Sequence, residues 1–396
     1  LLVRIFSTYF FSDNTLVNEW GIILHNYDIS GVFGYNVVLS DYHAIPKFAQ
    51  VGETVLPTVF MPPLYYYFIF IINYFLGNLF NLISAVVFFQ IIISLLSILL
   101  FYKILEDLEK NKTLVLIFST IFAFFPINIY ATSQISSISL QVFLVLAFFY
   151  TLLKIKDKSN LNFLIYFSIV SGLLILIRGE FFIFYFMTLI YFFLINIRKI
   201  KFIFISITIS LIVISPYLYR NYINFNTITI TKSFGYNLLK GNNSSLKVEG
   251  DSKFIEDNFN RKNLRIKTIK NYEIELDNFY KEKAFEEIAK SPMIYFFQYF
   301  KKVFSFLFLD INSSYPNYYN VFHIFPKLLL SITSIIGGII SLGRKNFFQY
   351  LSIYYFTNIL LFSMFFILPR YSLILLAVQL ILSLNAFNFL KRKLVN

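Results

Sequence analysis

Residues 81–105 read NLISAVVFFQIIISLLSILLFYKIL, an apolar run in which Lys103 is the one charged residue. A helix needs about 20 mostly apolar residues to cross the hydrocarbon core of a bilayer, and this run is long enough. Similar runs recur along the chain, at residues 58–76, 113–130, 134–154, 161–177, 181–197, 202–219, 322–343, 347–367 and 371–390. They are rich in Leu, Ile and Phe without polar alternation, which favours helices over a lipid-facing barrel. The sequence therefore predicts an all-α polytopic membrane protein with about 10–11 transmembrane helices.

The composition supports the same class of protein. Of the 396 residues, 58% are hydrophobic and 14% are charged, more apolar surface than a soluble domain could bury. The chain has no cysteine, which excludes disulfides and thiolate metal sites, and its three histidines are too scattered to predict a zinc site. We predict no cofactor and no metal ligands, although a divalent metal stays open. The chain does not begin with Met, and we interpret the short apolar run Leu1–Phe11 as the outer half of a first span, with further residues expected upstream.

Lysine and arginine gather in short loops, which predicts the orientation of the bundle. The clusters are Lys103, Lys110 and Lys112; Lys154, Lys156 and Lys158; Arg198, Lys199 and Lys201; Arg344 and Lys345; and Lys391, Arg392 and Lys393. Short basic loops face the cytoplasm, so we expect these clusters there. They account for the net charge of +13, and no nucleic-acid partner is predicted. The first loop, 13–57, has more acidic residues than basic ones, and we expect it outside.

The segment 58–76 does not fit this alternation simply. Both the first loop and the turn at residues 77–81 are expected outside, so an ordinary span would break the charge rule. We favour a juxtamembrane or re-entrant helix that begins at Pro62 and Pro63. A plain transmembrane helix with a weakly charged inner turn stays open, because individual loops depart from the rule.

The chain divides into three parts. Residues 1–219 form a transmembrane module that includes the exterior loop 13–57, residues 220–321 form an exterior polar and interfacial segment, and residues 322–396 form the last transmembrane helices. In the middle part, the alternation at 227–231 predicts a short strand, and the glycines and asparagines at 233–243 predict a polar turn. Residues 277–290 have one apolar stripe, typical of an amphipathic helix, and Pro292 ends it. The aromatic stretch 293–309 is interrupted by lysines and is expected to lie in the interface.

Asp13 is the candidate general base. It follows the first apolar segment, where a carboxylate could lie at the boundary of membrane and water and accept a proton from a hydroxyl. The alternative is a structural role, because Ser12, Asp13 and Asn14 could also cap a helix that runs through Trp20.

Three arginines lie at the outer ends of apolar runs. They are Arg178, Arg220 and Arg370, all on the face opposite the basic clusters. A charge at membrane depth usually faces a cavity or a partner, and arginine binds phosphate oxygens in a bidentate way. Together the three could hold a lipid phosphate. The alternative for each arginine is that its aliphatic stem lies along the apolar membrane surface while its guanidinium lies among the lipid headgroups.

The order of several short motifs resembles a known family. They are the acid after the first span, Pro-Pro-Leu-Tyr-Tyr at 62–66, Arg178 with Glu180, Pro-x-x-x-Arg-Asn-Tyr at 216–222, Gly-x-Asn-Leu followed by Gly-Asn-Asn at 235–243, Ala-x-x-x-Ile-x-x-x-Pro at 284–292, and Arg370 with Tyr371. This order is similar to that of the membrane-embedded GT-C glycosyltransferases. More narrowly, it resembles the bacterial branch close to protein mannosyltransferases and the lipid A aminoarabinose transferase.

The resemblance implies an inverting transfer of a sugar from a polyprenyl-phosphate donor to an acceptor on the outer face of a bacterial inner membrane. Asp13 would deprotonate or orient the acceptor hydroxyl. Arg178, Arg220 and Arg370, with Lys47 of the first loop, would hold the donor phosphate. The expected substrate-lining residues are Tyr65, Tyr66, Glu180, Asn221, Tyr222, Asn237 and Asn242.

Two departures and three alternatives accompany this interpretation. Asn14 stands where the family often has a second acid, and the second exterior loop, 132–137, has no carboxylate, so a metal-dependent mechanism is not favoured. A polymerase or ligase of surface polysaccharide would not require an acid after the first span. A transporter should have inverted repeats or charges deep in its helices, and the runs contain little beyond Gln90 and Gln141. A purely structural membrane protein would not require arginines on one face.

Overall fold

The computed structural model describes residues 1–12, 18–36, 49–158, 160–195, 200–259, 271–314, 318–344 and 346–395. Asp13 and Lys47, the expected base and one expected phosphate ligand, lie outside the described residues. Within these ranges the chain is almost entirely helical, with one short two-stranded sheet. The prediction of an all-α membrane protein is confirmed.

Five helical segments are long and apolar enough to cross a membrane: α4 (Leu82–Leu108), α7 (Ile138–Lys158), α10 (Ile200–Phe225), α15 (Val321–Leu342), and η4 (Pro369–Leu375) continued by α17 (Leu376–Val395). A sixth span results if the bent pair α5 (Lys112–Phe124) and α6 (Pro126–Ser133) counts as one. Shorter apolar helices follow the remaining runs: α1 (Leu2–Phe11), α3 (Leu64–Leu76), α8 (Leu161–Ile177), α9 (Phe181–Ile195) and α16 (Phe347–Phe362). Every expected apolar run is thus helical in the described residues, while the total of 10–11 spans stays a prediction.

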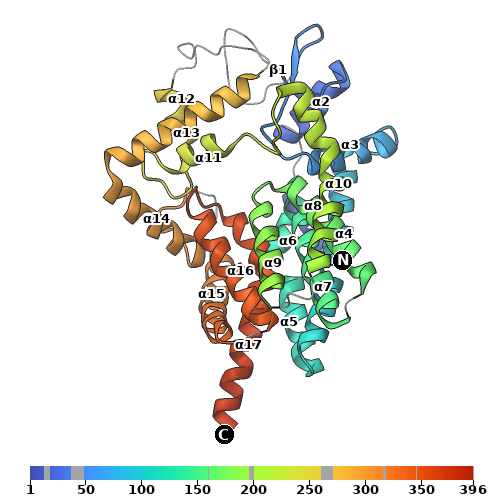
Figure 1. Cartoon of the computed structure of the whole chain (residues 1–396), viewed down its shortest axis with the longest axis vertical. Helices are drawn as coiled ribbons and strands as arrows, with labels where there is room; N and C mark the ends of the chain where they lie inside the picture. The colour runs from blue at the N-terminus through green and yellow to red at the C-terminus, as the bar shows by residue number, and fades with distance from the viewer. Residues whose placement is uncertain are drawn as a thin grey trace.

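Described members of the basic clusters lie at one end of the bundle. Lys154 at the end of α7 forms an ion pair of 2.6 Å with Asp107 at the end of α4. Arg344 donates a hydrogen bond of 2.8 Å to Asn385 of α17. We call this the basic end; it is the lower end in Figure 1. The grouping agrees with the charge pattern, and its assignment to the cytoplasm stays a prediction.

The opposite end carries most of the irregular chain, and we call it the loop end. In Figure 1 it holds α2 (Glu19–Ser30), the antiparallel pair β1 (Gly34–Asn36) and β2 (Val55–Pro57), and helices α11 to α13. Asn18 caps α2 by accepting a hydrogen bond of 3.2 Å from the backbone N–H of Gly21. The described helix through Trp20 begins at Glu19 with Asn18 as its cap, and the capping alternative for Asp13 and Asn14 lies outside the described residues.

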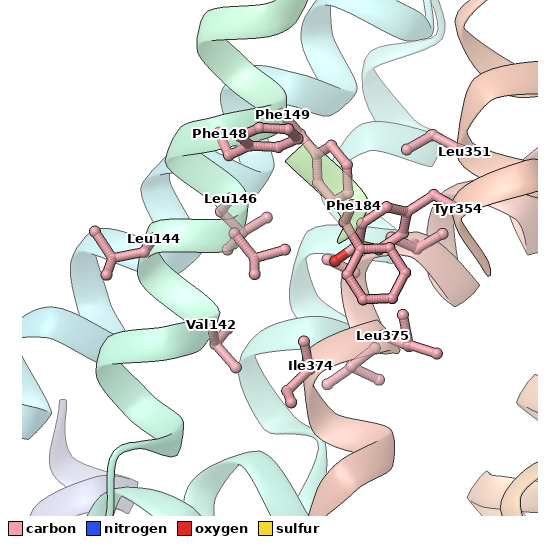
Figure 2. Close-up of a cluster of buried hydrophobic side chains, with 14 of the residues drawn as sticks. Val142, Leu144, Leu146, Phe148, Phe149, Phe184, Leu351, Tyr354, Ile374 and Leu375 are labelled. Atoms are coloured by element: carbon pink, nitrogen blue, oxygen red, sulfur yellow. The ribbon is translucent and has the colours of Figure 1, made fainter. Parts of the chain in front are cut away.

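Aliphatic and aromatic side chains pack together in a buried cluster of the bundle (Figure 2). The ring of Phe149 on α7 lies 5.1 Å from that of Tyr354 on α16, and Phe184 on α9 lies 5.0 Å from the same tyrosine. Elsewhere α15 packs closely on α17, because a Cβ at Gly337 would lie 1.8 Å from the Leu382 carbonyl oxygen. Close packing of this kind holds membrane helices together, since lipid tails are as apolar as the side chains.

Helix α3 is the described part of the apolar segment 58–76. It has 13 residues, which at 1.5 Å per residue gives about 20 Å, shorter than the hydrocarbon core of about 30 Å. It begins directly after Pro63 and lies beside the loop end in Figure 1. This length agrees with a juxtamembrane or re-entrant helix, and that placement stays a prediction.

The break between α5 and α6 is stabilised by a buried arginine. The two helices meet at an angle of 45°, and Pro126 begins the second. Arg4 of α1, 3% exposed, donates to the Ala123 carbonyl at 3.1 Å and to Ser94 Oγ at 2.8 Å. Asn128 donates to the Phe122 carbonyl at 3.2 Å. Both side chains satisfy carbonyls that a broken helix leaves without partners.

The segment 220–321 differs from its prediction in two places. Residues 227–231 form no strand; the backbone N–H of Lys232 instead donates to the Val59 carbonyl at 2.8 Å. The expected polar turn is the helix α11 (Phe234–Gly241). Its first amides, those of Gly235 and Tyr236, are capped by Asp277, which lies far along the chain. A local pattern cannot reveal such a cap.

The other helices of this segment agree with expectation. The amphipathic helix is α13, which spans Tyr272–Lys290 and begins earlier than predicted, and α12 (Ser252–Asn258) precedes it. Helix α14 (Pro292–Leu307) exposes Phe296, Phe297 and Phe300 on one face and buries Lys302 on the other. Such a two-faced aromatic helix is typical of an interfacial position.

Candidate functional site

Arg178 and Arg370 are brought together with Tyr371 at the loop end of the bundle. Arg178 caps the C-terminal end of α8, where the helix dipole favours a positive charge. Its Nε lies 2.6 Å from Glu180 Oε1, and its guanidinium lies 5.3 Å from the ring of Tyr371. On the other side the ring of Phe362 is 5.5 Å away. These rings and Glu180 fix the orientation of the guanidinium.

Lys240 interacts electrostatically with Arg370, although the sequence analysis did not single it out. It lies in the last turn of α11, with its Nζ 4.7 Å from the centre of the Phe366 ring. Burial lowers the pKa of Lys240, and the charge of Arg370 lowers it further. We call Arg178, Lys240 and Arg370 the cationic site. Like charges that repel one another favour a bound anion, because an anion removes their repulsion.

Gly241 is the local signal that places Lys240. A Cβ at this position would lie 2.2 Å from the carbonyl oxygen of Phe365, so the end of α11 lies directly against the loop that leads to Arg370. Only glycine permits so close an approach of two backbones. The Gly-Asn-Asn motif at 241–243 thus has a packing function, and the lysine before it reaches the arginines as a result.

The first loop contributes a carboxylate to the same region. Glu19 at the start of α2 interacts electrostatically with Lys240 and with Tyr35. In the sequence it was one of five acidic residues of that loop, with no distinguishing feature. The loop that contains Asp13 therefore approaches the cationic site in at least one described residue.

Arg220 has different partners. It donates to the carbonyls of Thr58 at 2.7 Å and Phe33 at 3.2 Å, and to Asn221 Oδ1 at 2.7 Å. These bonds hold the strands β1 and β2 against α10. In the described ranges no contact joins Arg220 to the cationic site. Its assignment to the donor phosphate stays a prediction, and the observed bonds give it a structural role.

Four of the expected substrate-lining side chains are buried and used internally. Asn221 is 0% exposed and donates to the Thr229 carbonyl at 2.7 Å. Asn242 donates to the Met364 carbonyl and accepts from Lys302 at 2.8 Å. Tyr65 and Tyr66 are also buried. The hydrogen bonds of Asn221 and Asn242 hold the protein's own chain, and the contact of all four side chains with a substrate stays a prediction.

The remaining expected residues stay accessible to different degrees. Tyr222 is exposed on α10, Asn237 is half-buried on α11, and Glu180 is paired with Arg178. Glu180 alone among the three lies at the cationic site. Within the described parts of the chain, no three His, Asp or Glu side chains gather in a way that could hold a metal ion.

Gln90 is the centre of a buried hydrogen-bond network, which we call the Gln90 hub. Its Oε1 accepts from the Tyr65 hydroxyl at 2.7 Å. Its Nε2 donates to the carbonyls of Gln134 at 2.9 Å and Thr132 at 3.2 Å. The turn between α6 and α7 is thereby fixed to α4 and α3. A polar side chain fully buried among membrane helices is costly unless it is satisfied, and this one is.

The same turn holds both sides of the segment that contains Asp13. Gln134 Nε2 donates to the Phe11 carbonyl, and Asn18 Nδ2 donates to the Ile135 carbonyl at 3.2 Å. Residues 13–17 themselves lie outside the described residues. Phe11 and Asn18, on either side of them, are both hydrogen-bonded to one turn.

Glu273 fastens the helix α13 to the chain after β2. It accepts from Thr58 Oγ1 at 2.7 Å and from the Val59 amide at 2.6 Å. Burial raises its pKa to about 7, against the opposite effects of these hydrogen bonds and of Arg220. A carboxyl of this kind carries a partial charge near neutral pH.

The fold defines a polytopic helical membrane protein. Over residues 61–219 the chain matches the family model of dolichyl-phosphate-mannose-protein mannosyltransferases. The resemblance inferred from the sequence motifs is thus confirmed for this part of the chain. The matched residues include α3 to α9 and most of α10, and with them Arg178 and the Gln90 hub.

A solved structure shares the fold over nearly the whole chain. It is the archaeal oligosaccharyltransferase AglB from Archaeoglobus fulgidus, in complex with an inhibitory peptide and a dolichol-phosphate, with a TM-score of 0.52 and 15% sequence identity. The alignment covers 99% of this chain and 50% of AglB, so the chain spans half the length of that protein. No curated protein matches the chain at a significant level.

Proposed function

We propose that this protein is an inverting glycosyltransferase that moves a sugar from a polyprenyl-phosphate donor to an acceptor at the loop end of the bundle. The observation that carries the proposal is the cationic site, because Arg178 lies on Tyr371 beside Arg370, and Arg370 interacts electrostatically with Lys240, where apolar helices end. A lipid phosphate with its chain in the bilayer has its charge at this level. The basic clusters at the other end support a loop end on the exterior face of a bacterial inner membrane.

The chemistry needs one base and a site for the leaving phosphate. The acceptor hydroxyl gives its proton to the carboxylate of Asp13 while its oxygen forms a bond to the anomeric carbon. The bond from that carbon to the phosphate oxygen breaks, and the electron pair stays on the departing polyprenyl phosphate. A single displacement inverts the anomeric carbon. The cationic site stabilises the charge that develops on the phosphate.

Each cation has a distinct part in this scheme. Arg178 has a guanidinium oriented by Tyr371 and Glu180, which suits bidentate contact with phosphate oxygens. Arg370 is exposed and meets the headgroup from the solvent side. Lys240 is half-buried and gains most from a bound anion, because its charge is disfavoured without one.

The test is a transfer assay in nanodiscs with a panel of radiolabelled polyprenyl-phosphate sugars and a mixed acceptor fraction of membrane lipids, glycans and proteins. Arg178→Gln and Lys240→Gln should each lower kcat by roughly 10²- to 10³-fold, the usual effect of removing one preorganised group that stabilises transition-state charge. Lys253→Gln is the matched control, since it removes one positive charge from the exposed side of α12.

Asp13→Asn should abolish transfer while donor binding persists. Equal transfer by Asp13→Asn and the unmodified protein would remove Asp13 from the mechanism. No transfer from any donor in the panel, or equal loss in the Lys253→Gln control, would reject the proposed function itself.

A further inference from the structure

Lys302 of α14 is a buried lysine that the proposed chemistry does not use. Its side chain is 0% exposed, and its Nζ donates a hydrogen bond of 2.8 Å to Oδ1 of Asn242. Within the described residues no carboxylate forms an ion pair with it, and burial lowers its pKa to about 7. A buried charge without a carboxylate partner opposes folding, so the stability of the fold does not explain a lysine at this position.

Asn242 is held in one orientation by this lysine. An ammonium group can only donate hydrogen bonds, so Oδ1 of Asn242 must face Lys302. Its Nδ2 group faces the other way and donates to the carbonyls of Leu238 in α11 and of Met364 in the loop after α16, both at 2.9 Å. The amide therefore ties α14 to α11 and to the loop that leads to Arg370.

Both parts that Asn242 joins carry members of the cationic site. Lys240 lies two residues before Asn242, and its Nζ lies 4.7 Å from the centre of the Phe366 ring. Phe366 in turn lies 6.0 Å from the ring of Tyr371, which is next to Arg370 in the chain. A shift of either part would therefore change the separation of Lys240 and Arg370.

Helix α14 also contacts the surroundings of the third cation. The ring of Phe306, one turn after Lys302, stacks on that of Phe362 at the end of α16, with 6.3 Å between the ring centres. Another neighbour of Phe362 is the guanidinium of Arg178, at 5.5 Å. Residues one turn apart share a face of a helix, so one face of α14 lies behind the cationic site.

We infer that Lys302 is a positioning residue of the cationic site, and that it acts through Asn242 by fixing the separation of the cations for an anionic phosphate. The inference rests on the proposed function for the identity of that anion, and Lys302 itself does not contact it. Hydrogen bonds from charged donors are about twice as strong as those from neutral ones. An ammonium group therefore holds the amide more firmly than a neutral side chain, although it is harder to bury.

The test uses the full chain in nanodiscs and two readouts. The first needs no donor lipid: acetic anhydride labels Lys240 at a series of pH values, and mass spectrometry of the labelled peptide gives the pKa of its amine. The charged groups that act on Lys240 are Arg370, which lowers its pKa, and Glu19 and Asp251, which raise it. The second readout is the dissociation constant of polyprenyl phosphate alone.

Two substitutions remove the bond between Lys302 and Asn242. Lys302→Met keeps an unbranched side chain without the donor or the charge, and Asn242→Leu removes the acceptor with no change of charge. Each should move the pKa of Lys240 up toward its ordinary value and weaken binding of polyprenyl phosphate by about tenfold, as for the loss of one charged hydrogen bond. The double variant should go no further than the stronger single one, because both side chains act through one bond.

Two controls lie on the same helix. Lys301→Met removes the charge of the exposed neighbouring lysine, and Tyr299→Phe removes a hydrogen bond of 3.0 Å from α14 to the Leu360 carbonyl. Both should leave the two readouts unchanged. Lys302→Gln, which keeps a neutral donor, should give an intermediate loss.

The inference is overturned if folded Lys302→Met protein gives the unmodified readouts, if its effect and that of Asn242→Leu add, or if either control reproduces them. Should Lys302→Met not fold, unmodified readouts in Lys302→Gln and Asn242→Leu overturn it instead. Failure of the unmodified protein to bind polyprenyl phosphate would reject the proposed function, while a shifted pKa of Lys240 would still support the positioning role. Normal binding with no shift of that pKa in Lys302→Met would reject this inference alone.

Discussion

Replacing Gln90 with Leu should release the turn that anchors both sides of the Asp13 segment. The substitution leaves the Tyr65 hydroxyl and the carbonyls of Thr132 and Gln134 without their buried partner. Hydrogen bonds between membrane helices contribute about 0.6 to 1.7 kcal/mol each, so the loss of three should lower the free energy of unfolding by roughly 2 to 5 kcal/mol.

The measurement is equilibrium unfolding in mixed micelles with SDS, together with the transfer assay. Tyr65→Phe removes one of the three bonds, and a double-mutant cycle with Gln90→Leu should give a coupling of about 1 kcal/mol. Activity should fall through kcat, with little change in the KM of the donor, because the hub positions the Asp13 segment and does not contact the cationic site.

Gln141→Leu is the matched control. Gln141 is also buried in a membrane helix, but its Oε1 accepts no hydrogen bond within the described residues. Its replacement should be neutral or slightly stabilising. The reasoning is refuted if Gln90→Leu is as stable as the unmodified protein, or if its effect and that of Tyr65→Phe simply add.

Three further predictions concern other contacts. Because the pKa of Glu273 is raised from 4.5 to about 7, its protonation in the folded state adds about 3 kcal/mol to the free energy of unfolding. This contribution is fully present below pH 4.5 and is lost as the pH rises through 7. Thermal unfolding from pH 4.5 to about 8 should show this decrease in stability, and Glu273→Gln should remove it. Gly337→Ala should destabilise the protein by roughly 1 to 3 kcal/mol through overlap with Leu382, whereas Gly343→Ala, with open space around it, should be neutral in the same unfolding assay. Arg4→Met should cost roughly 1 to 3 kcal/mol by leaving the Ala123 carbonyl unpaired, and an unchanged unfolding midpoint would contradict that role.

The helices could be predicted because the bilayer imposes one simple rule on them. Each apolar run corresponds to a described helix, and even the exception, α3, was indicated by Pro63 and by the charges around it. Helix α11 could not be predicted, because its cap, Asp277, comes from another helix. Local sequence shows the glycines and asparagines of 233–243 but not the partner that makes them helical.

The site was predictable in part. Arg178 and Arg370 were found because an arginine at the end of an apolar run is conspicuous, whereas Lys240 lies in a polar stretch where lysine is common. Asn221 and Asn242 were expected to orient a sugar, and that role stays a prediction. The structure adds that both amides donate to backbone carbonyls, which the sequence alone does not reveal.

The contact of Arg4 with the α5–α6 break has a consequence for how the chain is made. During synthesis α1 reaches the membrane before α4 and α5, so its arginine enters a bilayer in which Ser94 and Ala123 are not yet present. An unpartnered arginine in a helix centre opposes insertion by about 2.5 to 3.5 kcal/mol. We therefore expect α1 to stay beside the insertion machinery until the later helices emerge, so that α1 is released into lipid only with α4 and α5.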